Sequence, residues 1–121
     1  MTTKEYLSQV KQQDRRIGAL LERQRRYHEM GAWRTGGSAR MRALEKELDA
    51  RIDAYALLVL EIERVIDGVG DAQYRDVLRY RYLNGWNWQR IAERMSFSRD
   101  WVWRLHTRAL KVLEEQGVGQ T

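Results

Sequence analysis

Two short apolar stripes, separated by three residues that break the helical spacing, constrain the fold of this chain most strongly. Ile91, Ala92 and Met95 form the first stripe, and Ser96-Phe97-Ser98 interrupts it. The second stripe consists of Val102, Leu105, Ala109, Val112 and Leu113. This pattern predicts a short helix, a tight turn and a longer helix, with the small Ala92 where the two helices cross. Such a pair is typical of a helix-turn-helix.

The residues around both stripes fit the ends of these two helices. Asn84-Gly85 ends the preceding element, because both residues tolerate a positive φ. Asn87 and Ser98 stand where an N-cap is needed, since their side-chain oxygens can accept from unpaired backbone N–H groups. Asp100 lies in the first turn of the longer helix, where the helix dipole favours a carboxylate. We therefore expect the longer helix to occupy residues 98–113.

The rest of the chain is also helical in pattern, and its 121 residues include no Pro. Residues 3–27 carry a heptad seam that two Gln weaken, with Thr3, Val10, Ile17 and Gln24 at a and Tyr6, Gln13, Leu20 and Tyr27 at d. A broader stripe from Ser38 to about Val69 comprises Met41, Leu44, Leu48, Ile52, Tyr55, Leu58, Val59, Ile62, Val65, Ile66 and Val69. We expect these two helices to pair across a loop at residues 31–38.

The predicted fold class is all-α, a long antiparallel, coiled-coil-like helical hairpin followed by a helix-turn-helix module. Net charge is +3 for residues 1–30 and −3 for residues 41–70, which favours pairing of the two arms. We expect a hairpin domain at 1–70, for packing and oligomerisation, and a DNA-binding module at 71–121, whose first helix covers 71–83. Because apolar residues of the second arm outnumber those of the first, we expect part of its surface to pack on another chain or on the C-terminal module, and we expect a homodimer or a higher homo-oligomer.

The charge of the chain favours an acidic partner such as nucleic acid. Its net charge is +5, and residues 88–113 hold six Lys or Arg against two acidic residues. There is no Cys, no signal peptide and no apolar run of membrane-spanning length. These observations predict a cytoplasmic protein with no membrane partner.

Residues 74–85, with Ile91-Ala92-Glu93-Arg94-Met95, Ser98 and Arg108-Ala109-Leu110, resemble region 4 of bacterial sigma-70-type factors. That resemblance implies a module that binds the promoter −35 element in the major groove, and it permits contact with RNA polymerase. Ser96 stands where the family usually has Gly, and Arg90 replaces the usual Glu. A long charged helical N-terminus before such a module is similar to phage and prophage regulators of the ArpU/RinA type, which act on late or packaging genes.

The start of the longer helix holds the residues predicted to read DNA, because this part of a docked helix-turn-helix reaches base edges. The predicted base contacts are Arg99, Asp100, Trp101, Trp103 and Arg104. The predicted phosphate contacts are Trp88, Arg90, Arg94, Thr107, Arg108 and Lys111. The alternative is a solvated charged face with the Trp residues packed on the hairpin. Trp86 is expected to lie in the core.

The sequence thus predicts a sequence-specific double-stranded DNA-binding transcription regulator. Two alternatives stay open: a small terminase-like DNA-packaging subunit, and a region 4 mimic that binds RNA polymerase without DNA. No catalytic constellation, cofactor site or metal site is predicted, since His28 and His106 lie in different modules and zinc needs three or four convergent ligands. We expect His106 to face solvent, phosphate or a helix neighbour.

Overall fold

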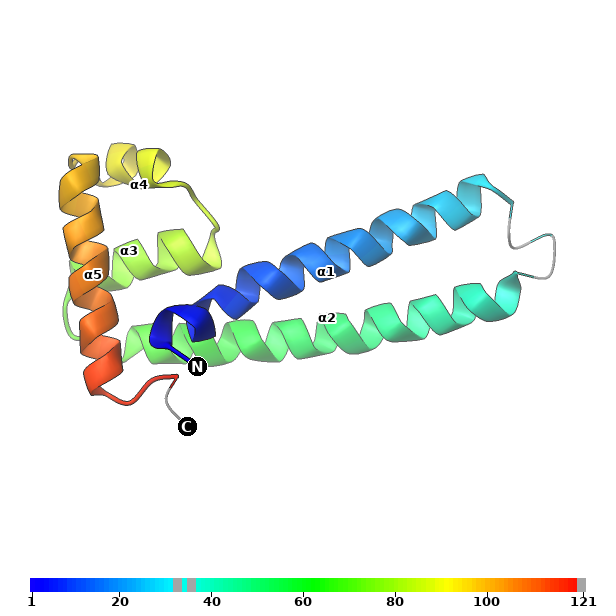
Figure 1. Cartoon of the computed structure of the whole chain (residues 1–121), viewed down its shortest axis with the longest axis horizontal. Helices are drawn as coiled ribbons and strands as arrows, with labels where there is room; N and C mark the ends of the chain where they lie inside the picture. The colour runs from blue at the N-terminus through cyan, green and yellow to red at the C-terminus, as the bar shows by residue number, and fades with distance from the viewer. Residues whose placement is uncertain (32–33, 35–36, 120–121) are drawn as a thin grey trace. The chain divides into compact units, whose positions relative to one another are not determined.

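All the regular structure of the described residues is helical. The computed structural model describes residues 1–31, 34 and 37–119, apart from the Ser38 side chain. Its elements are α1 (Thr3–Glu29), α2 (Ser38–Asp67), α3 (Ala72–Leu78), the π-helical turn η1 (Arg79–Leu83), α4 (Trp88–Met95) and α5 (Arg99–Glu115) (Figure 1). The all-α prediction of long N-terminal helices before a helix-turn-helix is confirmed. Half of the predicted loop at 31–38, residues 32, 33, 35 and 36, lies outside the described residues.

The chain packs as two compact units. One unit contains residues 1–11 together with 59–121, and the other contains residues 12–58. Both α1 and α2 therefore contribute residues to each unit. The limits of the units differ from the boundary at 70/71 expected from charge and composition. A functional division at 70/71 stays a prediction.

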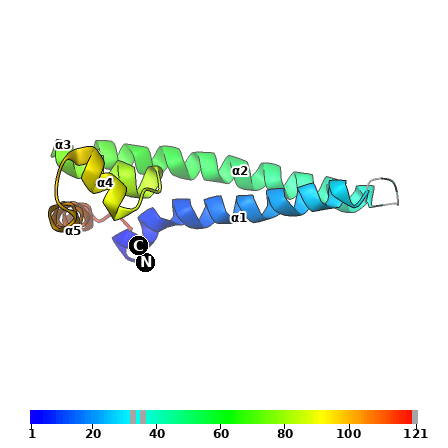
Figure 2. The ribbon, with the colours of Figure 1, turned by 90° about the horizontal axis from the view of Figure 1, so that it is seen from above.

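The unit of residues 12–58 is built from two helical segments that run side by side in opposite directions (Figures 1 and 2). Its core is formed by Leu20, Leu44 and Leu48, and the half-buried Ile17 and Tyr27 pack against it. All five belong to the two apolar patterns predicted for the arms. The ion pairs in this unit are exposed, so each stabilises it by less than about 1 kcal/mol.

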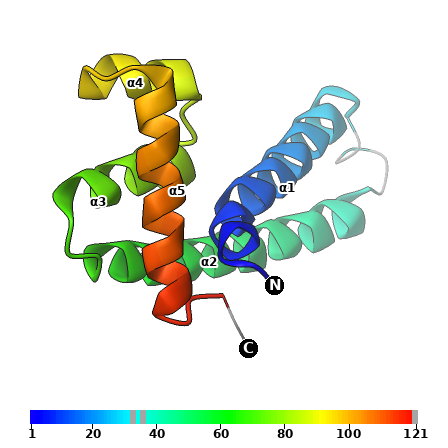
Figure 3. The same cartoon turned by 60° about the vertical axis from the view of Figure 1, so that its left-hand side comes forward.

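The other unit is centred on α5, which lies across α3 and α4 (Figures 1 and 3). Its buried apolar residues come from every element of the unit: Leu7, Val10, Ile62, Ile66, Val69, Val77, Leu78, Tyr82, Ile91, Ala92, Val102, Leu105, Ala109 and Leu113. Residues 1–11 are attached by polar contacts as well. The Thr3 hydroxyl donates to the Val118 carbonyl at 2.7 Å, and the Tyr6 hydroxyl donates to the Glu61 carboxylate.

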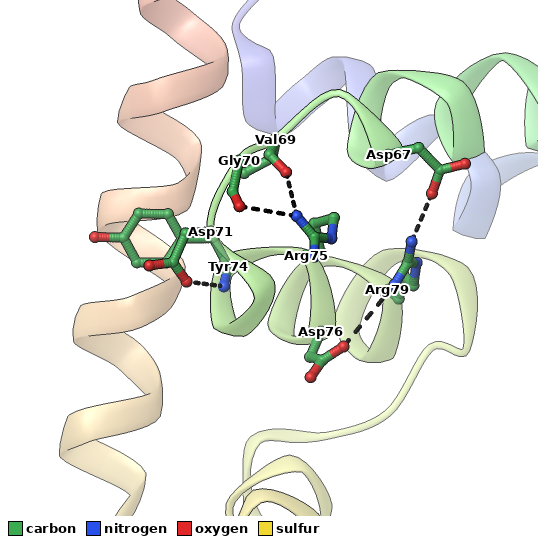
Figure 4. A network of polar contacts seen from close by, with 8 residues as sticks. All are labelled: Asp67, Val69, Gly70, Asp71, Tyr74, Arg75, Asp76 and Arg79. Carbon is green, nitrogen blue, oxygen red and sulfur yellow. Dashed lines mark hydrogen bonds and ion pairs between the residues drawn. The ribbon is translucent and has the colours of Figure 1, made fainter.

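The connection between α2 and α3 is held by the side chains of Asp71, which precedes α3, and Arg75 of α3 (Figure 4). Asp71 is the N-cap of α3 and accepts a hydrogen bond from the backbone N–H of Tyr74 at 3.0 Å. Arg75 donates to the carbonyl oxygens of residues 69 and 70, at 2.6 and 3.0 Å. These bonds satisfy backbone groups at a helix end that would otherwise lack partners. They fix the point at which the helix-turn-helix module joins α2.

Candidate nucleic-acid interface

The helix-turn-helix is built from α4 and α5, and its two N-caps are those predicted. Asn87 caps α4 by accepting from the Arg90 backbone N–H at 2.8 Å. Ser98 caps α5 by accepting from the Trp101 backbone N–H at 3.1 Å. Ala92 is only 4% exposed between the helices, as its small side chain suggested. The caps fix the direction in which α5 leaves the turn.

The turn between α4 and α5 depends on a left-handed residue. Ser96 ends α4 with φ 58° and ψ 41°, and it is the one non-glycine residue with positive φ among those described. This is the position at which the resembling family usually has Gly. The turn geometry is therefore retained without Gly, at the conformational cost that a Cβ atom meets in the left-handed region.

We expect Ser96→Gly to raise the free energy of unfolding by about 1 kcal/mol, because Gly adopts this conformation without the Cβ clash. Urea denaturation followed by circular dichroism measures it. Ser98→Ala is the matched control two residues on, where loss of the N-cap bond should lower stability by about 1 kcal/mol. Destabilisation by Ser96→Gly would contradict the left-handed turn.

α5 presents one buried face and one exposed face. Val102, Leu105 and Ala109 are at most 2% exposed, so the predicted core face is confirmed there, and Leu113 is fully buried. At about 100° per residue, the side chains on the opposite side come from residues 100, 104, 107, 108 and 111. These are Asp100, Arg104, Thr107, Arg108 and Lys111, and all are exposed. The exposed face therefore runs the length of the helix and carries three cations.

Three arginines near this face stack on tryptophan rings. The guanidinium carbon of Arg81 lies 4.4 Å from the centroid of a Trp88 ring. The same distance is 4.1 Å for Arg90 over Trp86 and 5.4 Å for Arg108 over Trp101. Cation–π contacts of this kind contribute roughly 0.5–1 kcal/mol at exposed sites. They restrict the rotamers of long side chains, which positions the charges before any partner binds.

Trp88 and Trp103 join α4 to α5 through an aromatic cluster. Their ring centroids are 5.2 Å apart, and the His106 ring lies 4.7 Å from Trp88 and 5.3 Å from Trp103. Trp88 is half-buried, whereas Trp103 is 49% exposed. Trp86, expected in the core, is half-buried and stacks on Tyr80 at 4.7 Å. Trp103 is thus both a packing residue and a surface residue of α5.

His106 lies in the interior and faces neighbouring helices, which is one of the three expected alternatives, whereas solvent and phosphate are not what it faces. It is 1% exposed, because it lies one helical turn from both Val102 and Ala109 on the buried face. Its Nε2 shares a hydrogen bond of 2.6 Å with the Tyr82 hydroxyl. Burial, followed by the charges of Lys4 and Arg81, lowers the pKa of His106 from 6.5 to about 4.

This pKa predicts a loss of stability in mild acid. Between pH 6.5 and pH 4, the His106 pKa values of the unfolded and folded chain, the unfolded chain binds more protons than the folded one. The free energy of unfolding is therefore highest above pH 6.5 and decreases towards pH 4. From pH 7 to 5 we expect a decrease of about 2 kcal/mol in the free energy of unfolding, measured by urea denaturation. His106→Gln should remove most of this pH dependence. The exposed His28→Gln is the control, and equal slopes for both variants would contradict the assignment.

Most of the residues that the sequence predicted to contact DNA lie at the surface. The predicted base contacts Arg99, Asp100, Trp103 and Arg104 are exposed, and Trp101 is half-buried against Phe97. Among the predicted phosphate contacts, Arg90, Arg94, Thr107, Arg108 and Lys111 are exposed and Trp88 is half-buried. Their contacts with DNA stay predictions. Lys4 and Arg81 were not predicted; Lys4 lies 5.9 Å from the centroid of a Trp103 ring.

Two classes of site are not found in the described part of the chain. No group of three or more His, Asp or Glu side chains there is arranged to hold a metal ion. Each described helix is too short or too polar to span a bilayer.

Comparison with known proteins identifies the C-terminal part of the chain. Residues 71–115, less than half of the sequence, match the family described as Sigma-70, region 4. Neither the curated proteins nor the solved structures include a match. The resemblance found in the sequence is therefore confirmed for this segment, and the limits of the match enclose α3, η1, α4 and α5. Residues 71–115 are thus similar to Sigma-70 region 4, which is a DNA-binding module of the helix-turn-helix type.

Proposed function

We propose that this protein is a sequence-specific DNA-binding transcription regulator that reads the major groove of duplex DNA with α5. The observation that carries the proposal is the exposed face of α5, which projects Arg104 and Lys111 away from the buried face. The region 4 match supports the same use of the second helix of the pair.

Within this proposal, two sets of residues have different roles. Arg99, Asp100, Trp101, Trp103 and Arg104 face base edges near the start of α5. Arg can bind O6 and N7 of guanine with two parallel hydrogen bonds, and an exposed indole can pack on a thymine methyl group. Trp88, Arg90, Arg94, Thr107, Arg108 and Lys111 contact phosphates on either side, which fixes the position of the protein without specifying sequence.

The proposal predicts specific duplex binding with a steep salt dependence. If about four to six phosphates are neutralised, log K against log salt concentration should have a slope of about −4 to −5. Selection from a random duplex pool measures the sequence preference. Titration of the selected duplex between about 50 and 300 mM salt measures the salt dependence of the affinity. A slope near zero, or equal affinity for selected and scrambled duplexes, would exclude reading of DNA by α5.

We further propose that the protein acts as a homo-oligomer and belongs to phage or prophage regulators of the ArpU/RinA type, acting on late or packaging genes. The support is the order of the chain, with long helices before the region 4 domain. Leu57 and Leu60 of α2, 69% and 53% exposed, are apolar surface available to a second copy. Light scattering tests the assembly: a dimer agrees with a regulator, and a large ring would favour a terminase-like packaging subunit.

RNA polymerase is a further proposed partner, since the resemblance permits the contact. Binding of RNA polymerase in the absence of any duplex binding would favour the region 4 mimic instead. A pull-down of RNA polymerase by this protein, with and without the selected duplex, measures the contact.

A further inference from the structure

A cavity outside the exposed face of α5 is lined by three cationic side chains. Its volume is about 60 Å³, and its walls include Lys4, Ser8 and Lys11 of α1 and Arg81 of η1. These residues all belong to the unit of residues 1–11 and 59–121. No carboxylate is among the residues that line the cavity. The charge around it is therefore positive and locally uncompensated.

The two lysines and the arginine are available to an anion. In the part of the chain that the structure describes, Lys4, Lys11 and Arg81 have no carboxylate within ion-pair distance. Three like charges around one cavity repel each other, and a bound anion would relieve that repulsion. Lys and Arg with a nearby hydroxyl are the groups that commonly bind phosphate oxygens.

Arg81 is held in place before any anion binds. Its Nη1 donates to the Trp86 carbonyl at 3.0 Å, which uses one of five N–H donors. Its guanidinium also stacks on Trp88. Since Arg81 follows α3 in a π-helical turn, this rigidity comes from the fold of the region 4 domain itself. The loss of side-chain entropy on binding is thereby reduced.

The cavity adjoins the surface proposed to read DNA. Lys4 lies 5.9 Å from the Trp103 ring, and Trp103 is 49% exposed on α5, one turn before Thr107. Trp88, on which Arg81 stacks, contacts the same Trp103 ring. A duplex bound along the exposed face of α5 would therefore bring a phosphate of its backbone towards this cavity.

We propose that the cavity formed by Lys4, Lys11 and Arg81 binds a phosphate of the DNA backbone. The N-terminal end of α1 thus extends the DNA interface beyond the matched residues 71–115, to which Lys4 and Lys11 do not belong. The contact is with phosphate alone, so it contributes affinity and salt dependence equally on all sequences. This inference rests on the proposed function, because it requires that the protein bind duplex DNA.

The test replaces the lysines in the full-length protein. Lys4→Gln with Lys11→Gln should lower the salt slope by about one, because one phosphate is contacted, and weaken selected and scrambled duplexes equally, by roughly eightfold at 0.1 M salt. Arg42→Gln with Lys46→Gln, both exposed on α2, is the control with the same change in net charge. Lys4→Arg with Lys11→Arg keeps the charges and should restore the slope. Circular dichroism verifies that all three variants fold.

The outcomes separate this inference from the proposed function. If the wild type binds duplex steeply and the Gln pair binds with an unchanged slope, the cavity is not a DNA contact although the function stands. Isothermal titration calorimetry with inorganic phosphate then shows whether the cavity binds a free anion instead. That result would equally overturn the proposal. An equal loss in the α2 control would assign the effect to net charge and overturn it too. If the wild type binds no duplex, both the function and this inference fail.

Discussion

Arg104→Ala is expected to weaken binding to the preferred duplex by about 1–3 kcal/mol, which is roughly 5- to 160-fold in Kd. Arg104 is exposed and lies opposite Val102, Leu105 and Ala109, which face the interior of the unit. It should therefore project furthest into the groove. Because one bidentate pair with a base is lost, preference should relax at one base pair only. Competition binding with single-base variants of the selected site measures this.

Arg108→Ala is the matched comparison on the same helix. Its guanidinium stacks on Trp101 towards one side of the exposed face, where a phosphate rather than a base is expected. Affinity should fall equally for selected and scrambled duplexes, and the salt slope should decrease by about one. If Arg108→Ala weakens only the selected duplex and Arg104→Ala weakens all duplexes equally, α5 docks in a rotated orientation. If neither substitution matters, α5 does not read DNA.

Leu7→Ala is expected to lower the free energy of unfolding by about 2–5 kcal/mol. Leu7 is fully buried and shares the cavity wall with Arg81 and Tyr82, so its loss leaves a void between α1 and the region 4 domain. Against a typical total of about 5–15 kcal/mol, this is a large fraction of the stability. Urea denaturation, followed by tryptophan fluorescence because all described tryptophans lie in this unit, measures it.

Leu21→Ala on the same helix supplies the control. Leu21 is 47% exposed, so its truncation should change stability by less than about 0.5–1 kcal/mol. Equal effects of the two substitutions would mean that residues 1–11 do not belong to the core of the unit. The region 4 domain would then be expected to fold alone, contrary to the burial of Leu7.

The helices and their ends could be predicted from the sequence because they depend on residues that are close together along the chain. Asn87 and Ser98 act through a side chain and a backbone N–H three residues away, so one short window contains the whole interaction. The buried face of α5 likewise follows from the spacing of Val102, Leu105 and Ala109. Exposure of Arg104 follows from the same spacing.

Contacts between segments that are distant in the sequence could not be predicted in this way. The bond between Tyr82 and His106 spans 24 positions, and the approach of Lys4 to Trp103 spans 99. Neither produces a periodic signal in the sequence, since each depends on how whole helices pack. The π-helical turn at Arg79–Leu83 was read as a continuation of one helix for the same reason. The packing of residues 1–11 with the C-terminal helices was missed as well.

The hydrogen bond from Thr3 to Val118 has a consequence for biosynthesis. Its partners are 115 positions apart, so Thr3 is synthesised well before the carbonyl group that it bonds. At translation rates of about 5–20 residues per second, that delay is roughly 6–23 s. Until then the nascent chain exposes Leu7 and Val10, which are buried in the finished unit. The unit of residues 1–11 and 59–121 is therefore completed only after α5 and the Val118 carbonyl have left the ribosome.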